Sequence, residues 1–147
     1  MKTFFIAAFM LVTLGSAIAA PFTPPVTTKV LSHFSENYSN AVNVKWTLAS
    51  SYTKATFTQN NKKWEVFYDN EGNLYGTSRN ISFSELPAKA SGYINKKYSD
   101  YGILETVEFD SESDGKLFFV SLQQGKKKVI LQVDANSWVS VFKRSRV

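Results

Sequence analysis

The sequence of 147 residues contains no cysteine and only one histidine, and both scarcities limit its chemistry. Without cysteine the chain has no disulfide, no catalytic thiol, no thiolate metal site and no thiol for lipid attachment. The single histidine, His33, cannot form a zinc site without several carboxylates, and no Gly-x-Ser-x-Gly motif provides a nucleophilic serine beside it. We therefore expect His33 to be a surface residue on the flank of a helix, with no catalytic role.

Motifs for phosphates and metal ions are also missing. No glycine-rich phosphate loop is present. Residues 110–115 resemble the first half of a calcium loop, but the closing position is Ser121 instead of a bidentate carboxylate, and a strand follows instead of a helix. Residues 69–73 resemble a hairpin loop in which Gly72 adopts a positive φ. We expect both segments to be hairpin loops, and we predict no metal site and no cofactor.

The first residues have the pattern of a secretory signal peptide. Lys2 precedes an apolar run that is too short to span a bilayer, and Ala17-Ile18-Ala19 fits the cleavage motif. We predict a signal peptide over residues 1–19, with an uncleaved membrane anchor as the alternative. Cleavage would leave 128 residues without a membrane anchor, enough for one domain, in the periplasm or outside the cell.

The charge is moderately positive, with 17 basic and 12 acidic residues and a formal net charge of +5. The basic residues are scattered except for two clusters, Lys126–Lys128 and Lys143–Arg146. Lysines on an exposed strand edge prevent unwanted strand pairing, and an exported protein rarely meets nucleic acid. We interpret the clusters as a solvated strand edge and a solvated tail, and we predict no nucleic-acid binding.

Hydrophobic periodicity predicts two amphipathic helices. Residues 20–25 form a proline-containing extended leader, after which apolar residues recur every four positions. This spacing predicts helices over about 25–40 and 86–99; its members are Val26, Val30, Phe34 and Tyr38 in the first helix, and Leu86, Ala90, Ile94 and Tyr98 in the second. Pro87 suits the beginning of the second helix, and Ser82 and Glu85 have the spacing of a capping box just ahead of it.

Alternating apolar and polar residues predict four strands after each helix. The first group lies around residues 42–48, 53–57, 64–68 and from 74 onward, and the second around 103–109, 117–123, 127–133 and 138–142. The two halves, about 26–80 and 81–147, match at offsets of 60 to 65 residues and form a degenerate repeat. We predict a single α+β domain over 26–147, with one antiparallel sheet and both helices packed side by side on one face. Phe34 and Tyr38 should then be buried together with Ile94 and Tyr98.

Three short motifs accompany this repeat: Trp46 near the end of the first strand, the turn Tyr68–Gly72, and Leu86-Pro87 at the second helix. Together with the repeat they resemble the PepSY-like family of small exported bacterial proteins, also called beta-lactamase-inhibitor-like. The resemblance implies a tandem helix-plus-four-strand fold and a location in the periplasm or outside the cell. The chain lacks the cysteines of the true inhibitor, and fold does not carry function with it.

Aromatic residues are the remaining candidates for function. We select Trp46, Tyr52, Trp64, Tyr75 and Trp138 as a candidate binding surface. Many of them can belong to the core, but tyrosine and tryptophan on the sheet face opposite the helices are typical interface anchors. The leading hypothesis is a noncatalytic module that binds a protein or peptide in the cell envelope, with modulation of an envelope enzyme as a related hypothesis. The alternatives are a carboxylate-dependent hydrolase or small-ligand enzyme without a recognisable motif, and a structural envelope protein.

Overall fold

The structure is a computed structural model and describes residues 26–146. The predicted signal peptide and the leader over 20–25 lie outside the described residues. Within residues 26–146 no helix is long and apolar enough to cross a membrane.

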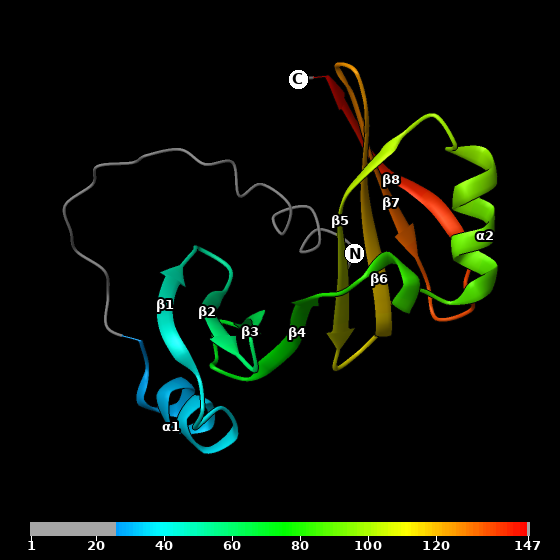
Figure 1. The fold of residues 1–147 in the computed structure, drawn as a ribbon. Helices are drawn as coiled ribbons and strands as arrows, with labels where there is room; N and C mark the ends of the chain where they lie inside the picture. Colours follow the sequence, from blue (N-terminus) through cyan, green and yellow to red (C-terminus); the bar gives the residue numbers. More distant parts are fainter. Residues whose placement is uncertain (1–25, 147) are drawn as a thin grey trace.

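Each half of the chain consists of a helix followed by four strands. The first half contains α1 (Thr28–Asn37), β1 (Val42–Leu48), β2 (Thr53–Gln59), β3 (Lys62–Tyr68) and β4 (Leu74–Asn80). The second contains the 3₁₀ helix η2 (Phe83–Glu85), α2 (Ala88–Lys97), β5 (Gly102–Ser111), β6 (Gly115–Gln124), β7 (Lys127–Val133) and β8 (Val139–Arg146). The eight strands form one antiparallel sheet in the order of the sequence (Figure 1). The predicted α+β class and repeated order of elements are therefore confirmed.

Both helices are shorter than predicted, and local chemistry sets their ends. The Thr27 hydroxyl accepts a hydrogen bond from the amide of Val30 and caps α1. The capping box of Ser82 and Glu85 caps the N-terminus of η2 instead of that of α2. Leu86 is extended because the proline that follows disfavours helical backbone, so α2 begins after Pro87.

One difference concerns the C-terminal strand. Residues 143–146, which we expected to be a solvated tail, belong to β8, where Lys143, Arg144 and Arg146 pair with residues of β7. The alternation that predicted β8 ends at Phe142, because residues 143–146 include no apolar residue. The turn predictions hold: Gly72 has a φ of +77° and Gly115, in the hairpin between β5 and β6, a φ of +71°.

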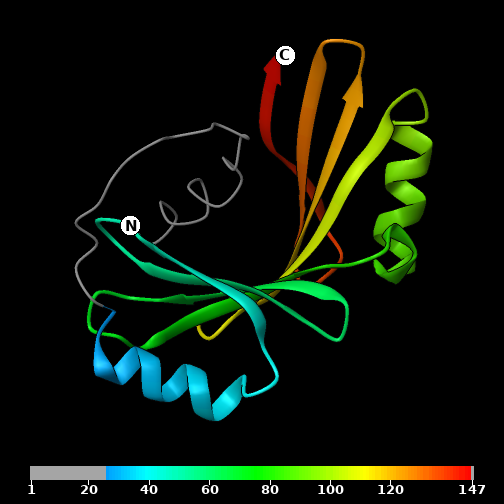
Figure 2. The ribbon, with the colours of Figure 1, turned by 60° about the vertical axis from the view of Figure 1, so that its left-hand side comes forward.

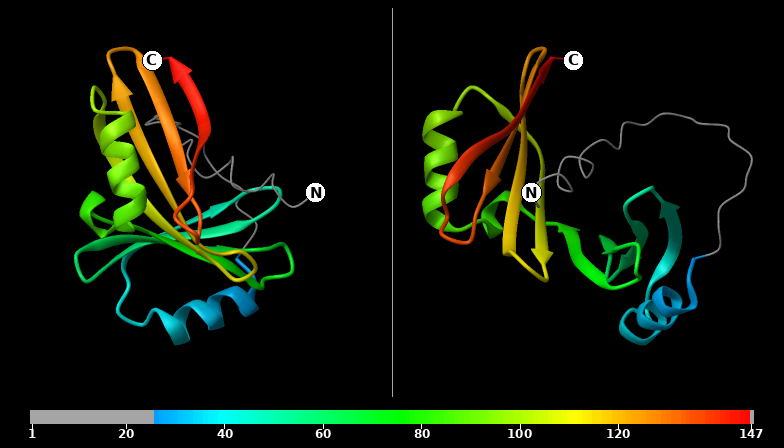
Figure 3. Two further views of the ribbon diagram at one scale, coloured as in Figure 1. Left: turned by 90° about the vertical axis from the view of Figure 1, so that its right-hand side faces the viewer. Right: turned by 180° about the vertical axis from the view of Figure 1, so that it is seen from behind.

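Both helices pack on the same face of the sheet, as the register shows. One cross-strand row runs from Trp64 through Arg79 and Glu108 to Phe118. Trp64 packs against the α1 core and Phe118 belongs to the α2 core. The sheet bends between its two halves, so that the helices lie on the outer side of the bend (Figures 2 and 3).

The expectation that the helices lie side by side is wrong. Phe34 is buried with residues of β2 and β3, whereas Ile94 is buried with residues of β6 and β7. Tyr38 packs against the cluster under α1, and Tyr98 packs against the cluster under α2. Each helix packs on the strands that follow it directly, and because the sheet is a simple meander, four strand spacings, roughly 19 Å, separate equivalent positions of the halves.

Candidate functional site

Two of the candidate aromatic residues, Trp46 and Trp64, lie on the helix-covered face. The Trp46 ring contacts Phe34 of α1 with 5.1 Å between ring centroids. Trp64 is packed against the same core, and the guanidinium of Arg79 lies 5.9 Å from its ring centroid. Both side chains are half-buried and therefore help to hold α1 on the sheet.

Trp138 lies elsewhere, in the turn before β8. Its side chain is 69% exposed, and the Asp134 carboxylate accepts a hydrogen bond from its backbone N–H. With Lys89 and Tyr93 of α2 it lines a shallow recess of about 150 Å³. Trp138 is thus an exposed residue at the edge of the α2 half, far along the chain from Trp46 and Trp64.

Tyr52 and Tyr75 lie on the face that neither helix covers, on the inner side of the bend. They border an apolar group that we call the concave-face cluster. Its members are the buried residues Phe67, Phe109, Leu117, Phe119 and Ile130, together with the partly buried Tyr52, Tyr75 and Phe142. The structure therefore divides the five candidate residues among three places and brings only two of them together.

Aromatic rings follow one another across the concave-face cluster. Centroid distances are 5.8 Å from Tyr52 to Phe67, 6.0 Å from Phe67 to Phe109 and 6.1 Å from Tyr75 to Phe109. On the side of β8, Phe119 and Phe142 are 5.3 Å apart. These separations are in the range in which aromatic pairs attract one another through edge and offset contacts.

A glycine in β4 makes this arrangement possible. A Cβ at Gly76 would lie 2.7 Å from the backbone oxygen of Asp110 and 2.8 Å from Cζ of Phe109. No side chain fits there without a shift of the backbone or the ring. Gly76 thus lets the Phe109 ring lie over β4, between Phe67 and Tyr75.

A buried ion pair adjoins the cluster on β2 and β3. Nζ of Lys54 lies 3.0 Å from Oε1 of Glu65, and both residues are 8% exposed. The hydroxyl of Thr56 also donates to Glu65 at 3.3 Å, and Nζ of Lys54 lies 5.7 Å from the Phe67 ring centroid. Because a buried charge is costly without its partner, this pair fixes the positions of both side chains at the border of the cluster.

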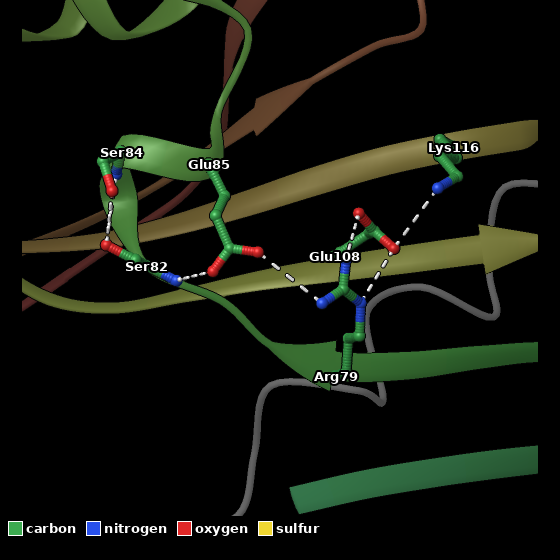
Figure 4. Close-up of polar contacts among 6 residues, drawn as sticks. All are labelled: Arg79, Ser82, Ser84, Glu85, Glu108 and Lys116. Atoms are coloured by element: carbon green, nitrogen blue, oxygen red, sulfur yellow. Dashed lines mark hydrogen bonds and ion pairs between the residues drawn. The ribbon is translucent and has the colours of Figure 1, made fainter. Parts of the chain in front are cut away.

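The helix-covered face carries a second polar group, in the gap between the helices. Arg79 forms a bidentate ion pair with Glu108, with two N–O distances of 3.1 Å, and also approaches Glu85 at 3.6 Å (Figure 4). Nζ of Lys116 lies 3.5 Å from Glu108. An open cleft of about 440 Å³ is lined by Arg79, Glu108 and Lys116 together with Trp64, Thr77, Ser78 and Asp110.

Two carboxylates in turns of the described residues have a lowered pKa. A hydrogen bond from the Ser82 amide, aided by Lys62 and Arg79, lowers the pKa of Glu85. Burial opposes ionisation of Asp69, but hydrogen bonds from Asn73 outweigh it and lower the pKa of Asp69. A general acid needs a raised pKa, so neither carboxylate is suited to that role.

His33 occupies a different environment from the exposed one that we expected. It is partly buried, and its Nδ1 lies 3.0 Å from the hydroxyl of the fully buried Tyr68. The contact satisfies the phenol, which would otherwise be a polar group without a partner in the core.

Residues 110–115 form the hairpin between β5 and β6, where the Ser111 hydroxyl accepts hydrogen bonds from the amides of Ser113 and Asp114. Among residues 26–146 no group of three or more acidic or histidine side chains is placed to hold a metal ion.

The sequence interpretation missed the phenylalanines of the concave-face cluster, although a signal was present. The runs Val66-Phe67-Tyr68 and Leu117–Val120 are apolar at successive positions, so both faces of β3 and β6 carry apolar side chains. Continuous apolar runs are typical of strands that are buried on both faces. The ion pair of Arg79 and Glu108 has no local signal, because its partners are 29 residues apart.

Comparisons with known proteins agree with this architecture. No protein-family model matches the chain, and no curated protein matches it. A BLIP-like protein from Bacteroides fragilis superposes with a TM-score of 0.68 at 22% identity, covering 86% of this chain and 89% of its own. A DUF2874 family protein from Bacteroides uniformis gives 0.73 at 15% identity, covering 84% and 91%. A candidate periplasmic protein from Bacteroides eggerthii gives 0.74 at 12% identity, covering 84% and 91%. These likenesses over most of both chains show that the protein has the BLIP-like fold.

Proposed function

We propose that this chain is an exported, noncatalytic module that binds a protein or peptide through its concave-face cluster. The observation that carries the proposal is the concentration of aromatic side chains on the sheet face that neither helix covers. A sheet face usually hides such residues under a helix or a second sheet, or uses them to bind a partner.

The composition of this face supports recognition of a protein. Tyr52, Tyr75 and Phe142 stand at the partly exposed border of the cluster, and aromatic residues are enriched among the residues that dominate binding energy. The fixed ion pair of Lys54 and Glu65 adds polar groups that can select among partners. The bend in the sheet makes the face concave, so it can enclose a protruding loop or helix.

The comparisons support the proposal through the fold. One structural neighbour is described as BLIP-like and another as a candidate periplasmic protein. We infer a periplasmic or secreted location from the signal-peptide pattern of residues 1–19, and membership of the PepSY-like family from the motifs at Trp46, Tyr68–Gly72 and Leu86-Pro87. Modulation of an envelope enzyme is the finer form of the same proposal.

Affinity capture from an envelope extract tests it. The mature chain, residues 20–147, is immobilised beside the variant Tyr52→Ala/Tyr75→Ala and the control Trp138→Ala, whose side chain is exposed away from the concave face. We expect one or more proteins to be captured by the parent chain and the control, with at least tenfold weaker affinity for the double variant in a titration. Melting temperatures of all three chains are measured alongside. A partner that binds the folded double variant as tightly as the parent, or is lost only with Trp138→Ala, contradicts the proposal.

A further inference from the structure

The end of the sheet beyond the C-terminus of α2 carries a dense group of basic residues from three segments. Pairing between β7 and β8 places Lys127 opposite Arg146, and Val129 opposite Arg144. The hydrogen bond to the Tyr93 hydroxyl raises the pKa of Lys97 at the end of α2, and Arg144 is near enough to oppose part of that rise. Figure 1 shows the hairpin between β6 and β7 next to the end of β8 at the upper end of the second half, with the end of α2 toward the same end, across β5.

We define the basic end as Lys97, Lys127, Arg144 and Arg146. All four residues are exposed. Within residues 26–146 none of them takes part in an ion pair, and Asp100, in the loop that follows α2, forms none with them. No carboxylate neutralises the basic end through an ion pair, in contrast to Arg79, Lys54 and Lys116, which have carboxylate partners. An unbalanced cluster gains free energy when an anionic surface approaches it.

Exposed apolar side chains lie at the same end of the sheet as these cations, on β5. A cross-strand row joins Ile103, Leu122, Val129 and Arg144 over three strand spacings, roughly 14 Å. Ile103 is 45% exposed and its neighbour Leu104 is 52% exposed. Tyr101 and Val129, with the basic residues of β7 and β8, line a recess of about 330 Å³.

The geometry points to a membrane-docking surface, in which the basic end binds phosphate groups of anionic lipids and Ile103 and Leu104 contact the interface. A solvated edge, the interpretation suggested by the sequence, explains the lysines but leaves the exposed aliphatic pair without a role. Cations next to exposed aliphatic and tyrosine side chains are typical of peripheral membrane surfaces. An acidic protein partner would be recognised by the charges alone. This surface is separate from the concave-face cluster, and the inference does not depend on the function proposed above.

Binding to vesicles of stated composition provides the test. The mature chain is sedimented with vesicles of phosphatidylcholine alone or with 30% phosphatidylglycerol. We compare the parent with Lys127→Glu/Arg144→Glu and with the control Lys45→Glu/Lys62→Glu, which makes the same change in net charge at exposed positions of β1 and β3. We expect binding only to the anionic vesicles. Affinity should fall at least 25-fold in the first variant, because each Lys or Arg near such a surface contributes roughly a factor of five. In the control it should fall less than threefold.

Further measurements distinguish anionic lipid from free phosphate and from an acidic protein as the ligand of the basic end. Raising the salt concentration should weaken binding strongly, and Ile103→Ser/Leu104→Ser should weaken it severalfold at every salt concentration. Equal losses in the two charge variants, no binding to anionic vesicles at low salt, or displacement by millimolar inorganic phosphate at constant ionic strength would each overturn the inference. So would binding to polyglutamate without binding to vesicles, since that result indicates an acidic protein partner.

Discussion

The same substitution, Gly to Ala, should have opposite effects at two positions of this chain. At Gly76 in β4 the new Cβ meets the backbone oxygen of Asp110 at 2.7 Å and the ring of Phe109 at 2.8 Å. At Gly92 in α2 it meets nothing within 4 Å. Both changes add one methyl group, so their effects differ through the surroundings of the two positions.

The magnitudes follow from this geometry. Overpacking a rigid contact lowers the free energy of unfolding by about 1–3 kcal/mol, whereas replacing glycine by alanine inside a regular element raises it by about 0.5–1 kcal/mol. We therefore expect Gly76→Ala to lower the free energy of unfolding by about 1–2 kcal/mol. Gly92→Ala should raise it by about 0.5–1 kcal/mol, because alanine favours helix and the site is open.

Urea denaturation followed by tryptophan fluorescence measures both changes. With a slope of about 1.5 kcal/mol per molar urea, the midpoint should fall by about 1 M for Gly76→Ala and rise by about 0.5 M for Gly92→Ala. In the Phe109→Leu background the Gly76→Ala change should cost less than in the parent, because the ring contact is gone, but it should still destabilise, because the carbonyl contact remains. A Gly76→Ala protein as stable as the parent would refute the view that the Phe109 ring depends on a glycine in β4.

Three other predictions concern the helix cores, a buried phenol and export. Phe34→Ala and Ile94→Ala should each lower the unfolding free energy by about 2–5 kcal/mol, because each removes a buried side chain from its helix core. Unfolding should remain a single transition, because both cores share one sheet, and two resolved transitions in calorimetry would contradict this. Burial raises the pKa of Tyr68 above its ordinary 10.0, so the stability from this group is present below pH 10 and decreases as the pH rises further. Tyr68 should therefore not titrate near pH 10–11, and the absorbance at 295 nm should rise equally in the folded parent and in folded Tyr68→Phe. A larger rise in the parent would refute this. Secreted protein should have the mass of residues 20–147, and a mass that retains Met1–Ala19 would show that the signal-peptide prediction is wrong.

Periodicity determined the elements of this fold with little help from long-range contacts. The four-residue spacing of Val30 and Phe34, and of Ala90 and Ile94, marks the buried stripe of each helix. Gly72 marks a turn through its backbone freedom, and Pro87 marks a helix start through its fixed φ. These are local properties, so a sequence displays them directly.

Which residues share a surface was decided by the tertiary structure. Trp64 and Phe67 are three residues apart on β3 yet face opposite sides of the sheet, because side chains alternate along a strand. The candidate surface chosen from residue type therefore mixed the two faces, and only Tyr52 and Tyr75 joined the concave-face cluster.

The sequence by itself determined the helix-plus-four-strand repeat, its single sheet and the absence of cysteine chemistry, because periodicity and composition are local. Only the tertiary structure placed the two helices on separate halves of one face, paired Arg79 with Glu108 and Lys54 with Glu65, and gathered Lys97, Lys127 and Arg144 at one end. These features depend on strand register and on the bend of the sheet. Both arise from many weak contacts between distant residues, and no short segment of the sequence encodes them.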